Sequence, residues 1–389
     1  MKDIIIDKTG WKKWRFDEVC RQVNVSSKDP KADGLHYVVG LEHIEPGNLH
    51  ITKWDTLEKE TTFTRKFVKG QVLFGRRRAY QRKVAYAEFD GICSGDILVF
   101  EAIEDILLPE LLPFLIQSDG FFEKALATSA GSLSPRTKFK ELADYEFLLP
   151  PKAEQKRLAE LLWVADEMIE KDKKEKRDLE IFRLSRLKSI FNSADLYIRL
   201  KDLPFEEING LWKTDDEDSI NVCVIRSTEF SDYGSLCFDK LESMPVKKSQ
   251  YKTRKLFSGD IILERSGGGP DQPVGRVCWF EREEGEYSFS NFTSCIRVFD
   301  NDVIVSKYLF YFLEYYWEMG GTDRIQNQTT GIRNLDYDLY KMIRIPIFDI
   351  NKQKQFICDI EQILISIYSL KANIELSLKL KQDLINKIF

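Results

Sequence analysis

The sequence contains no long hydrophobic run, no paired cysteine motif and no excess of basic residues. No apolar stretch could span a bilayer, and the first residues lack the apolar core of a signal peptide. The seven cysteines are scattered and never spaced as C-x-x-C, which is typical of reduced thiols. We therefore expect a cytoplasmic protein with no membrane association. Because the formal net charge is −5, any binding to nucleic acid must depend on local basic clusters.

Catalytic and metal-binding motifs are also missing. No nucleophile elbow, H-E-x-x-H, N/D-P-P-Y/F or acidic–lysine nuclease motif is visible, and the glycine run at 266–270 lacks the ending of a phosphate loop. The histidines His36, His43 and His50 lie seven residues apart, a spacing that invites a metal interpretation. Proline and glycine between them exclude one continuous helix, and odd spacing along a strand points side chains to opposite faces. The sequence predicts no catalytic residue, no metal and no cofactor in this chain.

Two long helices are the strongest positive feature. Residues 152–191 contain neither glycine nor proline, so one uninterrupted helix is expected there, and a second is expected from residue 352 onward. In both, apolar residues recur at spacings of three and four, which is typical of a seam between paired helices. The expected seam of the first helix is Leu158, Leu161, Ala165, Met168, Leu179 and Phe182. That of the second is Ile357, Ile360, Leu364, Ile367, Ile374, Leu378, Ile385 and Ile388.

The chain also repeats itself at a nearly constant offset. KGQVL at 69–73 matches SGDII at 258–262, and FDEV at 16–19 matches FEEI at 205–208. Several weak matches in constant order indicate a tandem duplication.

The sequence therefore predicts an α+β protein, a tandem duplication of two mixed α/β globular domains separated by two long helices that form an antiparallel coiled coil. The expected boundaries are 1–150 for the first domain, 151–194 for the central helix, 195–350 for the second domain and 351–389 for the C-terminal helix.

Basic residues cluster at corresponding places in the two copies. The first copy carries Arg76, Arg77 and Arg78 after a strand-like run, and if that strand continues, Arg77 faces away from the other two. Guanidinium groups grip phosphate and pair with guanine, so we favour DNA binding over an ordinary solvated surface. The candidates in these clusters are Arg65, Lys66, Arg76, Arg77, Arg78, Tyr80, Arg82, Lys83, Lys252, Arg254, Arg265 and Arg276.

A polar segment before each long helix provides further candidates. Its side chains suit adenine and guanine edges, and they equally suit a capping loop that leads into the next strand. These candidates are Arg136, Lys138, Arg324, Gln326, Asn327, Gln328 and Arg333.

With these features in place, the sequence resembles the specificity subunit of type I restriction-modification systems. The resemblance rests on VGLEHIEPGNL, KGQVLFGRRRAYQRKVAYAEFDGICSGDILVF and LLPPKAEQKRLAELL in the first copy. The second copy is similar through VIRSTEFSDYGSL, SGDIILERSGGGPDQPVGRV and IPIFDINKQKQFICDI. There, two extra residues separate the proline from the glutamine of the helix start.

The resemblance implies that each globular domain is a target recognition domain that reads one half of a split DNA sequence, while the paired helices set the gap. The implied partners are double-stranded DNA, two methyltransferase (modification) subunits and motor-nuclease (restriction) subunits. S-adenosylmethionine would bind the methyltransferase, and this chain would not be catalytic. The residues expected on the partner-binding helices are Leu158, Leu161, Ile357 and Ile360.

Two other functions stay open from the residues alone. One is a coiled-coil scaffold whose two globular domains bind protein partners. The other is a nuclease or methyltransferase with an unrecognised site.

Overall fold

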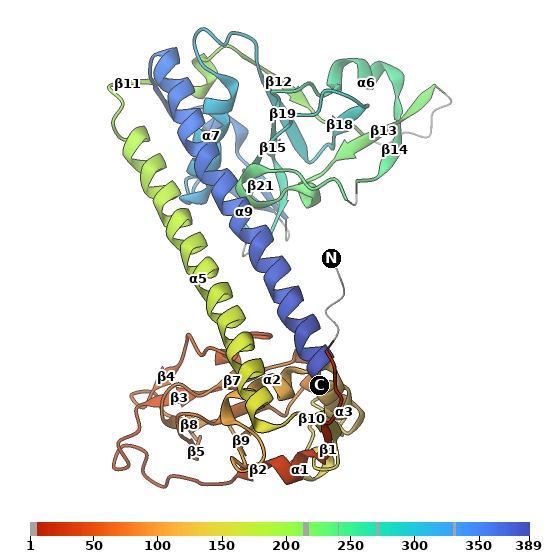
Figure 1. The fold of residues 1–389 in the computed structure, drawn as a ribbon. Coiled ribbons are helices and arrows are strands. Elements are labelled where there is room, and N and C mark those ends of the chain that lie inside the picture. The colour runs from red at the N-terminus through yellow and green to blue at the C-terminus, as the bar shows by residue number, and fades with distance from the viewer. Residues whose placement is uncertain (1–5, 213–217, 240, 270–271, 330–331) are drawn as a thin grey trace. The chain divides into compact units, whose positions relative to one another are not determined.

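The protein divides into two compact units, each with one globular part and half of each long helix (Figure 1). The first unit comprises residues 1–175 and 370–389, and the second comprises residues 176–369. The long helices are α5 (Lys152–Phe191) and α9 (Ile350–Ile388). Because the division between the units runs through both helices, the domain boundaries expected from the sequence stay a prediction. The computed structural model describes residues 6–212, 218–239, 241–269, 272–329 and 332–389.

The strands of the first unit are β1 (Lys12–Arg15), β2 (Cys20–Val23), β3 (Tyr37–Val39), β4 (Asp55–Thr56), β5 (Arg65–Phe67), β6 (Val72–Gly75), β7 (Val84–Tyr86), β8 (Gly91–Cys93), β9 (Ile97–Ala102) and β10 (Glu146–Leu149). They form two four-stranded sheets, in the orders β2-β9-β6-β7 and β4-β3-β8-β5, and a separate pair of β1 with β10. Val39 and Phe67 of one sheet share a core with Leu73 and Val99 of the other.

Short helices cover the other face of the β2-β9-β6-β7 sheet. They are α1 (Phe16–Val19), η2 (Ala79–Gln81), η3 (Pro109–Leu111), α2 (Leu112–Gln117), α3 (Asp119–Ala127) and α4 (Phe139–Leu142). The one-turn helix η1 (Leu41–His43) packs instead on the core between the two sheets. Every residue of α2 is buried, and Phe121 of α3 packs edge-on against Phe74 of β6 with ring centroids 5.7 Å apart. Ala159 of α5 and Ile385 of α9 belong to the same core, so both ends of the chain build the first unit.

The strands of the second unit are β11 (Leu196–Arg199), β12 (Phe205–Asn209), β13 (Ser219–Ile225), β14 (Ser243–Lys247), β15 (Ile261–Glu264), β16 (Ser266–Gly268), β17 (Val277–Trp279), β18 (Tyr287–Phe289), β19 (Thr293–Val298), β20 (Gln326–Thr329), β21 (Ile332–Leu335) and β22 (Arg344–Ile347). Its helices are η4 (Leu200–Asp202), η5 (Ser227–Glu229), η6 (Asp232–Gly234), α6 (Lys248–Arg254), α7 (Ser306–Glu318) and α8 (Tyr337–Tyr340).

The second unit repeats the topology of the first. The sheet β12-β19-β15-β17 corresponds to β2-β9-β6-β7, and the parallel pair β13 with β18 corresponds to β3 with β8. The predicted fold class, a duplicated α+β chain with two long helices, is confirmed. One expected match is wrong: Phe16–Val19 forms α1, whereas Phe205 begins β12, whose counterpart is β2. The two similar segments differ in structure because pairing with β19 fixes β12 and pairing with β9 fixes β2, and α1 precedes β2 in the chain.

Each long helix is tied to its globular part by a buried glutamine. Gln155 Nε2 donates to the carbonyls of Ile106 and Pro150, both at 2.9 Å, and its Oε1 accepts from the Leu108 amide at 3.0 Å. Gln353 repeats the pattern on α9, where its Oε1 accepts from the Val305 amide at 2.9 Å. These bonds require two donors and an acceptor on one side chain, which a carboxamide supplies. This requirement explains the glutamine at this position in both copies.

Within each unit α5 and α9 run antiparallel, as predicted. In the first unit the start of α5 and the end of α9 share one core, and in the second unit Leu187 and Phe191 share a core with Phe356 and Ile360. None of the described helices is long and apolar enough to cross a membrane.

The seam predicted for α5 is shifted by one residue. Leu161 and Met168 are 51% and 62% exposed, whereas Leu162 and Ile169 are buried. The buried face also contains polar side chains, such as Asp166, which counting only apolar residues overlooks. The α9 seam is largely confirmed, with Ile360, Leu364, Ile367, Ile374, Ile385 and Ile388 buried and Ile357 and Leu378 half-buried.

Candidate DNA interface

The arginine run of the first unit does not continue a strand. Strand β6 ends at Gly75, and Arg78 adopts a left-handed conformation with φ 54°. The Arg76 amide donates to the Asp96 carbonyl at 3.0 Å, and the Arg78 amide donates to the Pro135 carbonyl at 2.8 Å. These two bonds turn the chain, so the expected alternation of Arg76, Arg77 and Arg78 on two faces is wrong.

Three arginines, Arg76, Arg77 and Arg136, act on the carboxylate of Asp96, and the charge of Arg65 acts in turn on Arg76. We call these four residues the arginine cluster. Arg136 holds Asp96 through two bonds, 2.7 Å from Nε and 3.2 Å from Nη2, and Arg77 Nη1 lies 3.5 Å from the same carboxylate. The hydrogen bond from Arg136, reinforced by the charges of the other arginines, lowers the pKa of Asp96. Four cations with a single carboxylate among them leave a positive field, which suits a phosphate backbone.

The cluster joins segments that the sequence analysis treated separately. Arg77 and Arg136 form an isolated antiparallel bridge, and Arg77 also donates to Ser134 Oγ at 3.1 Å. Arg65 donates to the Ile97 carbonyl, which fixes it beside the cluster. Burial lowers the pKa of Arg76, although Asp96 opposes the shift.

The other basic candidates of the first unit have different surroundings. Arg82 Nη2 donates to Asp119 at 2.5 Å and its guanidinium lies 4.6 Å from the centre of the Phe122 ring. Lys83 Nζ donates to the Leu41 carbonyl at 2.6 Å. Lys66 is half-buried, and Lys138 is exposed ahead of α4.

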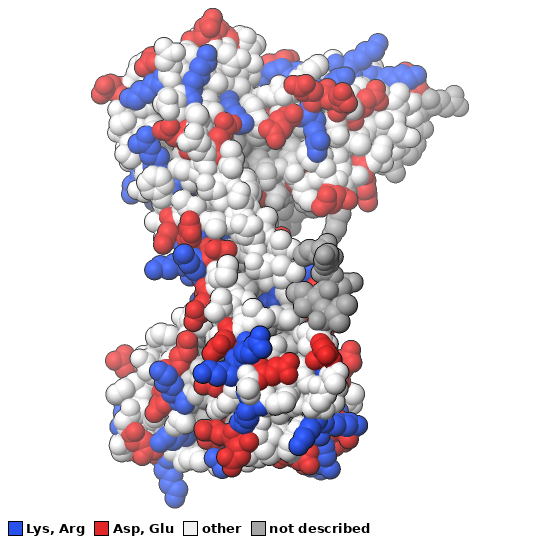
Figure 2. All heavy atoms as spheres, viewed as in Figure 1, with Lys and Arg blue, Asp and Glu red and all other residues white. Residues whose placement is uncertain are grey.

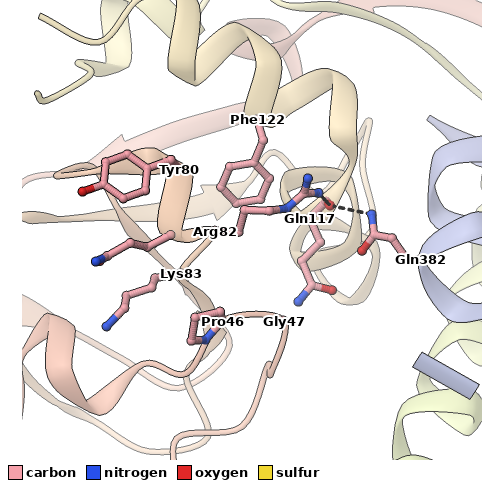
Figure 3. A pocket seen from close by; sticks show the side chains of 9 residues that line it. Pro46, Gly47, Tyr80, Arg82, Lys83, Gln117, Phe122 and Gln382 are labelled. Carbon is pink, nitrogen blue, oxygen red and sulfur yellow. Dashed lines mark hydrogen bonds between the residues drawn. The ribbon is translucent and has the colours of Figure 1, made fainter. Parts of the chain in front are cut away.

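A cavity of about 660 Å³ opens beside Arg82 (Figure 3). Tyr80 and Lys83 line it from the β6–β7 connection, Gln117 and Phe122 line it from α2 and α3, and Gln382, Gln81, Pro46 and Gly47 complete it. Its wall therefore combines aromatic, amide and basic groups.

In the second unit the expected polar loop is a hairpin. Strand β21 pairs with the glycine strand β16 on one side and with β20 on the other, so the described part of the polar segment lies in strands and not in a loop. Ser266 Oγ donates to Asn334 at 2.6 Å, which locks the glycine strand to the hairpin. Arg324 and Asn327 are exposed and Arg333 is half-buried, while the side chain of Gln328 lies outside the described residues. The Gln326 Oε1 atom is buried without a partner among the residues that the structure describes.

The remaining candidates divide into paired and exposed groups. Arg276 binds Glu264 through two 2.8 Å bonds, and Arg265 contacts Glu207 at 3.1 Å while lying 4.3 Å from the Tyr337 ring centre. Arg254 donates to the Asn209 carbonyl at 2.9 Å, and Lys252 is exposed on α6. Figure 2 shows basic side chains interspersed with acidic ones on the visible face of each unit. The DNA-binding role of each of these candidate residues stays a prediction.

Two of the three histidines of the first unit, His43 and His50, have polar neighbours. Glu42, His43 and Asp55 bring possible metal ligands within 4.8 Å of one another. However, His43 Nδ1 already accepts from the Gly40 amide at 2.9 Å, and Asp55 pairs with a lysine at 2.5 Å. The absence of a metal site, expected from the sequence, stays a prediction.

Two residues were missed by sequence reasoning. Asp96 organises the arginine cluster, and the sequence carried only a weak signal for it, a single acid in the turn between two strand-like runs. Gln117 lies buried beside the cavity, and the signal was a lone amide at the end of an apolar helical run.

Comparison with known proteins gives a consistent family. Residues 8–180 match the family described as type I restriction modification DNA specificity domain. The type I restriction enzyme EcoDI specificity subunit of Escherichia coli is 26% identical over 163 residues, which cover 40% of this chain. The matched stretch spans only 36% of the length of that relative.

Two solved structures share the fold. The type I restriction-modification S subunit from M. genitalium covers 98% of this chain and 96% of its own, with a TM-score of 0.60 and 15% identity. A chain from a type I R-M system studied for complex assembly and conformational transition covers 98% and 97%, with a TM-score of 0.57 and 19% identity.

Proposed function

We propose, on the premise that this chain belongs to the family of type I restriction-modification specificity subunits, that it is the sequence-reading subunit of such a complex. Each unit reads one half of a bipartite site in double-stranded DNA, and the paired helices set the gap between the halves. The DNA-binding residues are drawn from the candidates above, with the arginine cluster on the first half-site.

The observation that carries this proposal is that two copies of one scaffold present different side chains at equivalent positions. Arg76 donates its amide to the Asp96 carbonyl, and Arg265 donates its amide to the Phe292 carbonyl at 2.9 Å, so Phe292 takes the place of Asp96. Phe292 is 48% exposed. Because base edges are distinguished by donor, acceptor and methyl patterns, two surfaces of different chemistry suit two different half-sequences.

An exposed apolar face on α5 supports docking of a partner. Leu161, Val164 and Met168 are 51%, 53% and 62% exposed and follow one another at spacings of three and four, so they lie on one side of the helix. An apolar stripe of this kind indicates a protein interface. We assign it to one of two methyltransferase subunits, which would bind S-adenosylmethionine; motor-nuclease subunits would join the same assembly.

The chain itself is proposed to be non-catalytic and to act in the cytoplasm. A coiled-coil scaffold that binds only protein is the alternative, and DNA binding separates the two. Genomic fragments should shift in an electrophoretic assay when the chain is mixed with its methyltransferase subunit, and the shifted fragments should share one bipartite motif. Failure of the assembled complex to enrich any motif over random fragments would favour the scaffold.

A further inference from the structure

The cavity of the first unit has an unusual wall residue. The Gln117 side chain is 4% exposed, and neither its Nε2 nor its Oε1 finds a hydrogen-bond partner among the described residues. Its backbone carbonyl, by contrast, accepts from Arg82 at 3.0 Å and from Gln382 at 3.1 Å. The backbone of Gln117 is thus fixed, while its carboxamide lies unpaired between Arg82 and the Pro46–Gly47 turn (Figure 3). A buried amide is ordinarily hydrogen-bonded, so the exception points to a ligand group.

In the second unit the residue at the position of Gln117 has a partner within the protein. Gln117 follows Leu108 by nine residues, as Glu314 follows Val305, and the amides of Leu108 and Val305 bind the two matching glutamines of the long helices. Glu314 is paired with the buried Arg183 at 3.1 Å. The counterpart of Gln117 is therefore saturated by an ion pair.

In the first unit the residue that corresponds to Arg183 does not pair with Gln117. Lys381 follows Gln353 by 28 residues, as Arg183 follows Gln155, so Lys381 is the counterpart of Arg183. Lys381 Nζ instead binds Asp166 at 2.5 Å, and Gln117 is left without it. At this position the two copies differ: in the second unit Arg183 of the protein pairs with Glu314, and in the first unit Gln117 is left for a neutral partner.

The rim of the cavity is built to present an aromatic ring. Tyr80 is 57% exposed and lies on the one-turn helix η2, between Arg78 and Arg82, which have φ of 54° and 52°. Residues other than glycine seldom adopt this conformation, and two of them at one turn indicate a segment whose shape serves a function. Arg82 is held by Asp119 and Lys83 by the Leu41 carbonyl, so the rim is fixed before any ligand arrives.

We propose that this cavity is a nucleobase site, which receives one unstacked nucleotide of the bound DNA. The Gln117 carboxamide offers a donor beside an acceptor, which matches a base edge that carries the same pair in reverse, such as that of adenine. The exposed ring of Tyr80 stacks on the base, and Arg82 and Lys83 face its phosphate. A volume of about 660 Å³ accommodates a nucleotide. The proposal rests on the proposed function, because it requires that DNA lie on the first unit.

The test uses the chain assembled with its methyltransferase subunit and a duplex containing the enriched motif, in which 2-aminopurine replaces one base at a time. We expect fluorescence to rise several-fold on binding at one position within or beside the first half-site. Gln117→Leu should abolish that rise and weaken binding about tenfold, while its melting temperature stays unchanged or increases because an unpaired buried amide is removed. Gln355→Leu, which changes an exposed glutamine on α9, is the matched control and should behave as the unaltered chain.

The outcomes separate this proposal from the function on which it rests. Absence of motif binding by the unaltered complex would contradict the proposed function itself. Intact motif binding without any fluorescence rise, or with no effect of Gln117→Leu, would overturn the nucleobase site alone. Titration with free 2-aminopurine deoxynucleoside monophosphate provides a further arm. The free nucleotide could bind saturably, and lose this binding in Gln117→Leu, while DNA gives no fluorescence rise. That result would overturn the assignment of the base to DNA.

Discussion

At the scale of single residues, Asp166 links three elements of the first unit. Its carboxylate on α5 lies 2.8 Å from His50 Nε2 of the globular part and 2.5 Å from Lys381 Nζ of α9. The other ring nitrogen of His50 lies 2.9 Å from Glu88. Two carboxylates against one imidazole raise the pKa of His50 to about 9, chiefly through the hydrogen bond to Asp166 and against the effect of burial. Burial alone would raise the pKa of Asp166, but His50 and Lys381 lower it.

This arrangement predicts a pH dependence of stability. Because the folded pKa of His50 exceeds its unfolded value of 6.5, its contribution is complete below pH 6.5 and is lost as the pH rises towards 9. We expect the free energy of unfolding of the first unit to fall by about 2 kcal/mol across this interval. Chemical denaturation at a series of pH values measures it, and His50→Gln should flatten the profile. Identical profiles for the two proteins would show that the ion pairs add nothing.

Arginines of the two units should respond differently to truncation. Arg77→Ala removes one cation of the arginine cluster, so the salt dependence of DNA binding should fall by about one unit while stability changes little. Arg276→Ala leaves Glu264, whose side chain is 2% exposed, without its partner, and should cost about 3 kcal/mol of stability. Affinity across a salt series and denaturation, applied to both variants, distinguish the two effects. A salt slope unchanged by Arg77→Ala would remove that residue from the interface.

Residue roles were only partly predictable from the sequence. The basic clusters are visible as letters, but the convergence of Arg77 and Arg136 on Asp96 depends on a bridge between segments 59 positions apart. The unpaired state of Gln117 could not be read at all, because it follows from where Lys381 finds its partner.

At the scale of elements, the two long helices show what periodicity can and cannot fix. The α9 seam is almost wholly apolar, and its buried face was predicted correctly at Ile360 and Ile385. On α5 the buried face includes Gln155, Asp166 and Arg183, and each binds a partner far away in the sequence. Counting apolar residues alone therefore placed the buried face of α5 one residue too early. The polar residues on that face are buried because they have partners, and those partners are known only from the fold.

Because Leu161 is exposed and Ile360 is buried, substitutions at the two positions distinguish an effect on partner binding from an effect on stability. Leu161→Asp alters an exposed side chain, so it should leave stability nearly unchanged while weakening binding of a methyltransferase subunit. Ile360→Asp places a charge at a fully buried position and should cost more than about 3 kcal/mol.

Denaturation and native mass spectrometry of the assembled complex measure both effects. Leu161→Asp alters only the exposed face of α5, so the number of bound methyltransferase subunits should fall from the proposed two to one. Retention of both subunits would contradict the assignment of this face.

At the scale of the whole molecule, duplication was predictable and the composition of each unit was not. Repeated segments at a constant offset indicate two copies, but they do not reveal that residues 370–389 complete the first unit. Ile385 and Ile388 are fully buried in its core, and Asn386 Nδ2 donates to Asp119 at 2.6 Å. Long-range contacts of this kind join the two ends of the chain and leave no local pattern in the sequence.

The central claim is that the two units read separate halves of one DNA site, and a domain exchange tests it most directly. Residues 1–150 are replaced by the corresponding domain of another family member, and a second chimera also exchanges residues 370–389, so that the core at Ile385 stays matched. Each chimera is expressed with the methyltransferase subunit, and methylated adenines or cytosines are mapped across the genome. The account predicts that one half of the methylated motif changes while the other half and the gap are retained. Alteration of both halves, or a motif identical to that of the unaltered chain, would contradict it.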